Sequence, residues 1–191
     1  MEKLIVIIEG PSGVGKDRII LGLIEKYPNI YKKMPSITTR PMRPSENPGD
    51  PYYHVTREEF ENKIKTGEVF EHTTRHGEYR GMSLDIINSL IARGFTQIKD
   101  CDLVGMNALK KEFGDSVFSI FITAPRDVVE ARLISRGDSE QDRITRLKDY
   151  EDKMSQEKYF DITVQNIGDI DIAVNEVHEH IEKRKKQNEA K

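Results

Sequence analysis

A glycine-rich segment at residues 10–17, with the sequence GPSGVGKD, constrains this chain more than any other feature. It follows a run of apolar, mostly β-branched residues at 3–9, which is typical of a strand buried on both faces of a parallel sheet. Apolar residues then recur at helical spacing, at Ile19, Ile20 and Leu23. Strand, glycine loop and helix in this order gather backbone N–H groups at a helix N-terminus, where they bind phosphate. The segment therefore predicts binding of a nucleoside triphosphate.

Each residue of this loop is a candidate ligand of the triphosphate. The set is Gly10, Pro11, Ser12, Gly13, Val14, Gly15, Lys16 and Asp17. The Lys16 ammonium is expected to reach the outer phosphates. The motif usually continues with Ser or Thr, whose hydroxyl ligates magnesium, but Asp17 occupies this position. A carboxylate also binds Mg²⁺, so Asp17 is the candidate metal ligand, although without metal its charge would repel the phosphates.

Length and composition favour a single cytoplasmic domain. The 191 residues carry 30 Lys and Arg against 33 Asp and Glu. The chain therefore lacks the excess of positive charge that would indicate binding to nucleic acid. The single Cys101 excludes an intramolecular disulfide and fits a reducing compartment. The apolar run at 4–8 is too short for a membrane span. We expect small-molecule substrates, no nucleic acid or membrane partner, and a monomer or homodimer.

The rest of the chain alternates between predicted strands and helices. Further strands are expected at 95–101, 117–123 and 161–165. Helices are expected at 57–65, 83–93, 104–113, 126–135 and 140–158, with a last helix from Ile170 to Ile181. The proline-rich residues 35–51 are interpreted as an ordered loop, and 68–80 as short strand-like pieces. This alternation predicts an α/β fold with a parallel sheet flanked by helices.

One loop combines hydroxyl and guanidinium groups that suit a phosphate monoester. Ser36, Arg40, Arg43 and Tyr52 lie within it. The planar guanidinium group of arginine matches phosphate oxygens, and a phenol donates to the same oxygens. The alternative is a charged surface loop without a ligand.

A second cluster of arginines lies further along the chain, at Arg132, Arg136, Arg143 and Arg146. Phosphoryl transfer needs positive charge around the moving group, and these side chains are candidates to close over a triphosphate. They are equally able to form surface ion pairs with the neighbouring acids Glu130, Glu140 and Asp142.

Two acids, Glu71 and Asp102, stand apart from the charged surface segments. Asp102 follows a predicted strand, at the end where parallel sheets bind ligands. A carboxylate only accepts hydrogen bonds, so it suits a ring edge that presents two N–H groups, as guanine does and adenine does not. Either acid is otherwise an ion-pair member or, for Asp102, a helix cap.

Read together, these segments resemble the guanylate kinase family of ATP:GMP phosphotransferases. The matching motifs are GPSGVGK at 10–16, SITTRPMR at 36–43, VTREEF at 55–60, FE at 70–71, GEYRGMS at 77–83 and RLISRG at 132–137. The resemblance covers about residues 3–171. It implies a core of 1–34, 84–130 and 151–191 with a five-stranded parallel sheet, an inserted acceptor-binding domain at 35–83, and a lid at 131–150.

The resemblance also implies a role for each candidate residue. Ser36, Arg40, Arg43 and Tyr52 would hold the acceptor's phosphate, with Glu71 and Asp102 reading guanine. The catalytic set would be Lys16, Arg132, Arg136 and Arg146, and Asn166 would lie near the adenine of ATP. Magnesium would accompany ATP.

Three departures from the family pattern leave the acceptor open. Asp17 replaces a hydroxyl residue, Arg80 replaces a phosphate-binding tyrosine, and Met82 replaces a hydroxyl that helps to hold guanine, while Ser83 lies one position too late. Arg80 can still bind phosphate. The Lys-Asp pair in the loop is similar to that of ribose 1,5-bisphosphate phosphokinases. A guanylate kinase is the leading hypothesis; the alternatives are a kinase of another phosphorylated acceptor and a catalytically idle binding module.

Overall fold

A computed structural model describes residues 4–44 and 46–190 of the chain. Its main sheet has five parallel strands in the order β2-β7-β1-β8-β9. The strands are β1 (Ile5–Glu9), β2 (Tyr31–Lys33), β7 (Thr96–Lys99), β8 (Val117–Thr123) and β9 (Ile162–Gln165). The predicted fold class is confirmed. Lys3, the first residue of the first predicted strand, lies outside the described residues.

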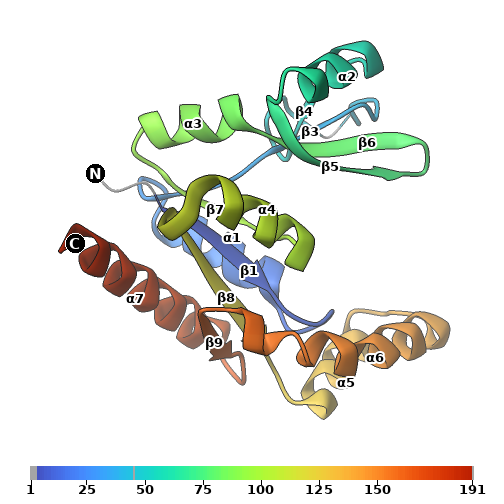
Figure 1. Ribbon diagram of the computed structural model, residues 1–191. Coiled ribbons are helices and arrows are strands. Elements are labelled where there is room, and N and C mark those ends of the chain that lie inside the picture. The colour runs from blue at the N-terminus through green and yellow to red at the C-terminus, as the bar shows by residue number, and fades with distance from the viewer. Residues whose placement is uncertain (1–3, 45, 191) are drawn as a thin grey trace.

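Helices cover both faces of this sheet (Figure 1). Helices α1 (Lys16–Lys26) and α7 (Ile170–Glu189) pack on one face, and α3 (Leu84–Ala92) and α4 (Leu103–Phe113) on the other. Every residue of β1 is buried, since its alternate side chains enter apolar clusters on opposite faces. This two-sided burial is the reason for the apolar run that the sequence shows.

A second sheet with its own small core lies at one end of the molecule (Figure 1). Its strands, in the order β4-β3-β6-β5, are β3 (Ser36–Thr38), β4 (Tyr52–His54), β5 (Val69–Arg75) and β6 (Glu78–Ser83). Helix α2 (Arg57–Lys65) begins at a capping box in which Thr56 and Glu59 bond reciprocally. Its Phe60 is fully buried and packs with Ile37 and Val69. These elements fall within the predicted insertion at 35–83.

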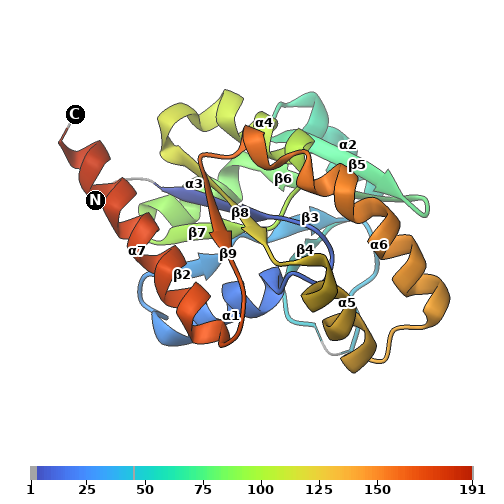
Figure 2. The same cartoon turned by 90° about the horizontal axis from the view of Figure 1, so that it is seen from below.

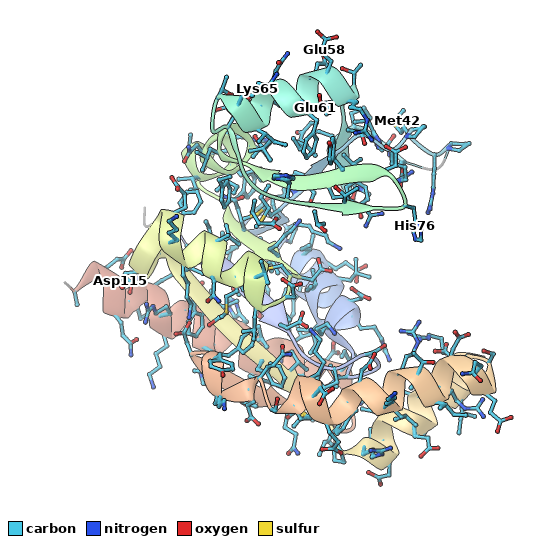
Figure 3. All side chains as sticks on the ribbon, turned by 45° about the vertical axis from the view of Figure 1, so that its right-hand side comes forward. Met42, Glu58, Glu61, Lys65, His76 and Asp115 are labelled. Carbon is cyan, nitrogen blue, oxygen red and sulfur yellow. The ribbon has the colours of Figure 1, made fainter. Side chains whose placement is uncertain are left out.

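Helices α5 (Arg126–Ser135) and α6 (Glu140–Met154) lie at the opposite end of the molecule, across the main sheet from the second sheet (Figures 1 and 2). Two short 3₁₀ helices, Gly114–Ser116 and Glu157–Tyr159, complete the elements of the described chain. In Figure 3 the β5–β6 hairpin, which turns at His76, and helix α6 extend on the same side of the molecule.

The proline-rich loop prediction is wrong at Ser36–Thr38, which form β3. The strand exists because β4 and β6 pair with it on either side and Ile37 enters the small core. Strand β2 was not predicted, since two of its three residues are lysines. The helix predicted at 140–158 ends at Met154. No helix in the described part of the chain has the length and apolar character to cross a membrane.

Candidate active site

Two pockets open where the parallel strands end, which is the edge at which α/β sheets bind ligands. The P-loop pocket has a volume of about 530 Å³ and is lined by the glycine loop, arginines of α5 and α6, and Asn166 after β9. The inter-sheet pocket, of about 310 Å³, lies between the main sheet and the second sheet. The residues after β2 and β7 line it together with side chains from β3, β4, β5 and β6.

The glycine loop leads directly into helix α1 and leaves the helix N-terminus open. Gly15 precedes the helix in a left-handed conformation with φ of 98°, and no side chain caps the first turn. A Cβ atom at this position would lie 2.4 Å from Asn166 Nδ2, so only glycine fits. The uncapped N–H groups are the donors that a phosphate requires.

The Lys16 side chain folds back onto the loop. Its ammonium donates to the carbonyl oxygens of Gly10, at 2.5 Å, and Pro11, at 3.1 Å. Burial lowers the pKa of Lys16, against the raising effect of the nearby Glu9 carboxylate. Glu9 itself accepts a hydrogen bond of 2.9 Å from Lys153 of α6. The two carbonyls hold the Lys16 ammonium within the P-loop pocket. This is the location that its predicted role requires.

Arg132 and Asn166 are both attached to the loop. Arg132 donates to the carbonyls of Val14, at 3.2 Å, and Asn166, at 3.1 Å, and the Asn166 amide donates to Val14 at 2.7 Å. Asn166 is 1% exposed, and its Oδ1 has no hydrogen-bond partner. Both residues line the P-loop pocket, and their side chains donate to backbone carbonyls.

The remaining arginines of the predicted lid converge on Asp138, an acid that the sequence analysis did not consider. Its carboxylate accepts from Arg136 Nε, at 2.7 Å, and pairs with Arg146 Nε at 3.1 Å, while its carbonyl accepts from Arg143 at 3.0 Å. The Arg136 hydrogen bond lowers the pKa of Asp138. Arg146 also donates to Ser12 of the loop, at 2.6 Å. Asp138 thus holds Arg136 and Arg146, two of the three predicted catalytic arginines, at the P-loop pocket.

Asp17 is exposed in the first turn of α1 and lines the P-loop pocket. Within the described residues, no group of three or more His, Cys, Asp or Glu side chains is arranged to hold a metal ion. Magnesium does not require one, since it is usually held by one or two carboxylates together with substrate phosphates and water. A single carboxylate beside a phosphate loop fits that pattern.

The inter-sheet pocket brings together five of the predicted acceptor ligands: Ser36, Tyr52, Glu71, Arg80 and Asp102. Hydroxyl and guanidinium donors come from β3, β4 and β6. The two carboxylates come from β5 and from the start of α4. The pocket therefore offers both donors for an anion and acceptors for N–H groups.

Arg40 and Arg43 do not line this pocket. Arg40 bonds Glu46 at 2.6 Å, and its guanidinium lies 5.5 Å from the centre of the Tyr52 ring. The Arg80 guanidinium group approaches the same ring, at 5.0 Å from its centre. Arg43 is exposed and contacts Glu46 only through its backbone, since its N–H donates to the Glu46 carboxylate and its carbonyl accepts from the Glu46 N–H. The Glu46 carboxylate therefore holds the Arg40 guanidinium group, but it does not contact the Arg43 side chain.

The charge of Asp102 acts on Glu71 in this pocket. Burial, followed by the charge of Asp102, raises the pKa of Glu71. Asp102 is the N-cap of α4, where its Oδ1 accepts from the Gly105 N–H at 3.0 Å. The helix-cap alternative is therefore correct for Asp102, and the same residue also lines the pocket.

Met82 and Ser83 behave as their positions in the sequence predict. Met82 is 2% exposed and packs in the apolar cluster between the main sheet, α3 and α4. The Ser83 hydroxyl caps α3 and donates to Glu68, so it does not replace the missing hydroxyl. The sequence analysis overlooked Lys33, Lys99 and Asp100, which also line the pocket. For Lys99 and Asp100 the available signal was the presence of charged residues near the end of the strand predicted at 95–101, whereas Lys33 lies in a strand that was not predicted.

A glycine loop at the carboxyl edge of a parallel sheet, with arginines around it and a second polar pocket at the same edge, defines a P-loop nucleotide-binding protein. The chain belongs to the guanylate kinase family, whose model, described as guanylate kinase, matches residues 1–184. A guanylate kinase from Streptococcus pyogenes serotype M3 is 33% identical over 165 residues, which cover 85% of this chain and 78% of the relative.

Solved structures give the same assignment. The crystal structure of a guanylate kinase from Anaplasma phagocytophilum matches with a TM-score of 0.64 and 25% identity, covering 95% of this chain and 85% of that one. An uncharacterized protein from Eubacterium ventriosum matches with a TM-score of 0.52 and 15% identity, covering 95% and 99%, and shares the fold.

Proposed function

We propose that this protein is a guanylate kinase, which transfers the γ-phosphoryl group of ATP to GMP and yields ADP and GDP. The observation that carries the proposal is the pair of pockets at one edge of the main sheet. One has a phosphate loop with arginines, and the other has two carboxylates together with phosphate-binding donors. Membership of the guanylate kinase family supports this assignment. It does not favour either alternative raised from the sequence.

In the P-loop pocket, the phosphates of ATP would accept from the N–H groups at the start of α1. Lys16 would exchange its two loop carbonyls for phosphate oxygens. Arg136 and Arg146 lie at the edge of this pocket, where their charge would offset the negative charge of the transition state. Asp17 is the residue that would hold Mg²⁺, which neutralises phosphate charge when it is bound.

In the inter-sheet pocket, Glu71 and Asp102 would accept from the N1–H and N2–H groups of guanine. Ser36, Tyr52 and Arg80 would donate to the phosphate of GMP. An oxygen of this phosphate would attack the γ-phosphorus of ATP while the bond to the β-phosphate oxygen breaks.

The test is an acceptor panel with the purified protein, ATP and Mg²⁺. GMP, AMP, CMP, UMP and ribose 1,5-bisphosphate are supplied in turn, and products are separated by chromatography. GDP is expected as the main product, and a Lys16→Ala variant prepared in parallel should lose it. The proposal fails if GDP stays at background while another acceptor is phosphorylated, or if ATP binds without turnover of any acceptor.

A further inference from the structure

Lys99, the last residue of β7, carries an ammonium group that the proposed reaction does not yet use. In the parallel pairing of β7 with β1, Lys99 lies beside Ile7, which packs in the same apolar cluster as Met34 and Met82. Paired residues project from the same face of a sheet. The Lys99 side chain therefore rises from the face of the main sheet that carries the inter-sheet pocket, and it lines that pocket.

The contacts of this ammonium leave its charge without a counter-ion. It donates to Ser36 Oγ, at 2.5 Å, and to the Met34 carbonyl, at 3.5 Å. Among the residues that the structure describes, Lys99 forms no ion pair. Burial lowers the pKa of Lys99, while the charges of Asp100 and Glu71, neither of which forms an ion pair with it, oppose this effect. A buried cation without a paired anion is costly, and an anionic ligand removes that cost.

The hydrogen bond to Ser36 also fixes the direction in which the serine hydroxyl donates. An ammonium has only donors, so Ser36 Oγ must be the acceptor of this bond. The Ser36 proton is then free to point at a ligand oxygen. Tyr52 and Arg80 offer further donors in the same pocket. Several donors in one pocket, two of them cationic, match a group with several oxygen acceptors and negative charge, which is a phosphate.

We propose that Lys99 is a phosphate-binding residue of the inter-sheet pocket, acting with the Ser36 hydroxyl on the acceptor's phosphate. This inference deepens the proposed function and rests on that function for the identity of the acceptor. The binding of phosphate by Lys99 does not depend on that identity, because the donors fit the phosphate of any acceptor. Lys99 thereby joins Arg80 in shifting acceptor affinity toward the phosphate, while the buried Met82 contributes no hydrogen bond to the base.

The test compares the binding of GMP and of guanosine to the wild-type protein and to Lys99→Met by calorimetry. Loss of a charge-assisted hydrogen bond predicts GMP binding that is about 10- to 100-fold weaker, with guanosine and ATP binding unchanged. Lys32→Met is the matched control: Lys32 is on the neighbouring strand β2, faces the Phe95 ring and does not line the pocket. It removes the same charge and should leave GMP binding unchanged.

A double-mutant cycle and a second ligand test the same proposal independently. In a double-mutant cycle with Ser36→Ala, the two losses should be less than additive, because the residues act as a pair. Ribose 5-phosphate, which has the phosphate but no base, is the second probe. If the wild type binds it but not GMP, the guanylate kinase proposal fails; Lys99→Met should still lose the binding of ribose 5-phosphate.

A purely structural role for Lys99 would weaken GMP and guanosine equally, and that result would overturn the inference, as would unchanged GMP binding in Lys99→Met. Lys99→Gln, which keeps a donor toward Ser36 without the charge, replaces Lys99→Met if thermal melting shows that the methionine variant is unfolded. The same comparison of GMP with guanosine then distinguishes phosphate binding by Lys99 from a purely structural role.

Discussion

Replacement of Glu71 by glutamine tests how this protein distinguishes its acceptor base. Glu71 is half-buried beside Asp102 in the inter-sheet pocket. Glutamine keeps the shape of the side chain but turns one acceptor into an N–H donor, which faces an N–H group of guanine. A hydrogen bond to a charged group is worth about 1.5–3 kcal/mol. We therefore expect kcat/KM for GMP to fall about 10- to 150-fold, since each 1.4 kcal/mol is tenfold.

The loss should be specific to the base. KM for ATP should not change, because Glu71 does not line the P-loop pocket. The preference for GMP over AMP should narrow, since a glutamine amide pairs with the N1 and amino groups of adenine. The assay couples ADP release to NADH oxidation with each nucleotide varied in turn. Glu58→Gln is the control, because Glu58 lies on α2 and points away from the rest of the molecule (Figure 3).

The pH dependence gives a second readout of the same carboxylate. Burial, with the charge of Asp102, raises the pKa of Glu71 above the usual value of a glutamate. Only the ionised form accepts from both guanine N–H groups, so KM for GMP should rise as the pH falls through this raised pKa. In Glu71→Gln that rise should be reduced. Equal losses toward GMP and ATP, or an identical pH profile in the variant, would refute the assigned role.

Three further substitutions test other parts of the structure. Asp17→Ser should keep turnover but need more Mg²⁺ for half-maximal rate, because a neutral hydroxyl binds the metal more weakly; a collapse of activity in a folded variant would give Asp17 another role. Gly15→Ala should weaken ATP binding at least about tenfold, measured by titration, because its Cβ meets Asn166 Nδ2, whereas Gly67→Ala, which faces open space, should not. Phe60→Ala should lower the free energy of unfolding by about 3–5 kcal/mol in denaturant titrations, since Phe60 is fully buried; a loss below about 1 kcal/mol would contradict its place in the small core.

The main sheet could be predicted because most of its strands carry their own signal. In β1 and β8 every residue is buried, and both appear in the sequence as predominantly apolar runs. The strands β2 and β3 have three residues each and depend on partners that are distant in the chain. No local pattern distinguishes such short strands from loop, so only the assembled sheet defines them.

The candidate site likewise contains residues that local sequence predicts and residues that only the folded structure defines. The glycine loop was predicted because its spacing is itself the signal. Lys99 was not predicted, because its contact with Ser36 joins residues 63 positions apart. Asp138 was missed for another reason. Several acids near the arginines were equally possible partners, and only the turn between α5 and α6 selects one of them.

The structure of Asp102 allows it to cap a helix and, as we propose, to recognise a base at the same time. Its Oδ1 accepts from the Gly105 N–H at the start of α4, and the residue also lines the inter-sheet pocket. An ionised carboxylate has about four lone-pair sites, so one capping bond leaves Oδ2 for a ligand. The cap holds the carboxylate in one orientation before the ligand binds, which reduces the side-chain entropy lost on binding. Helix α4 would therefore act as a rigid support for the carboxylate that we propose to face the base.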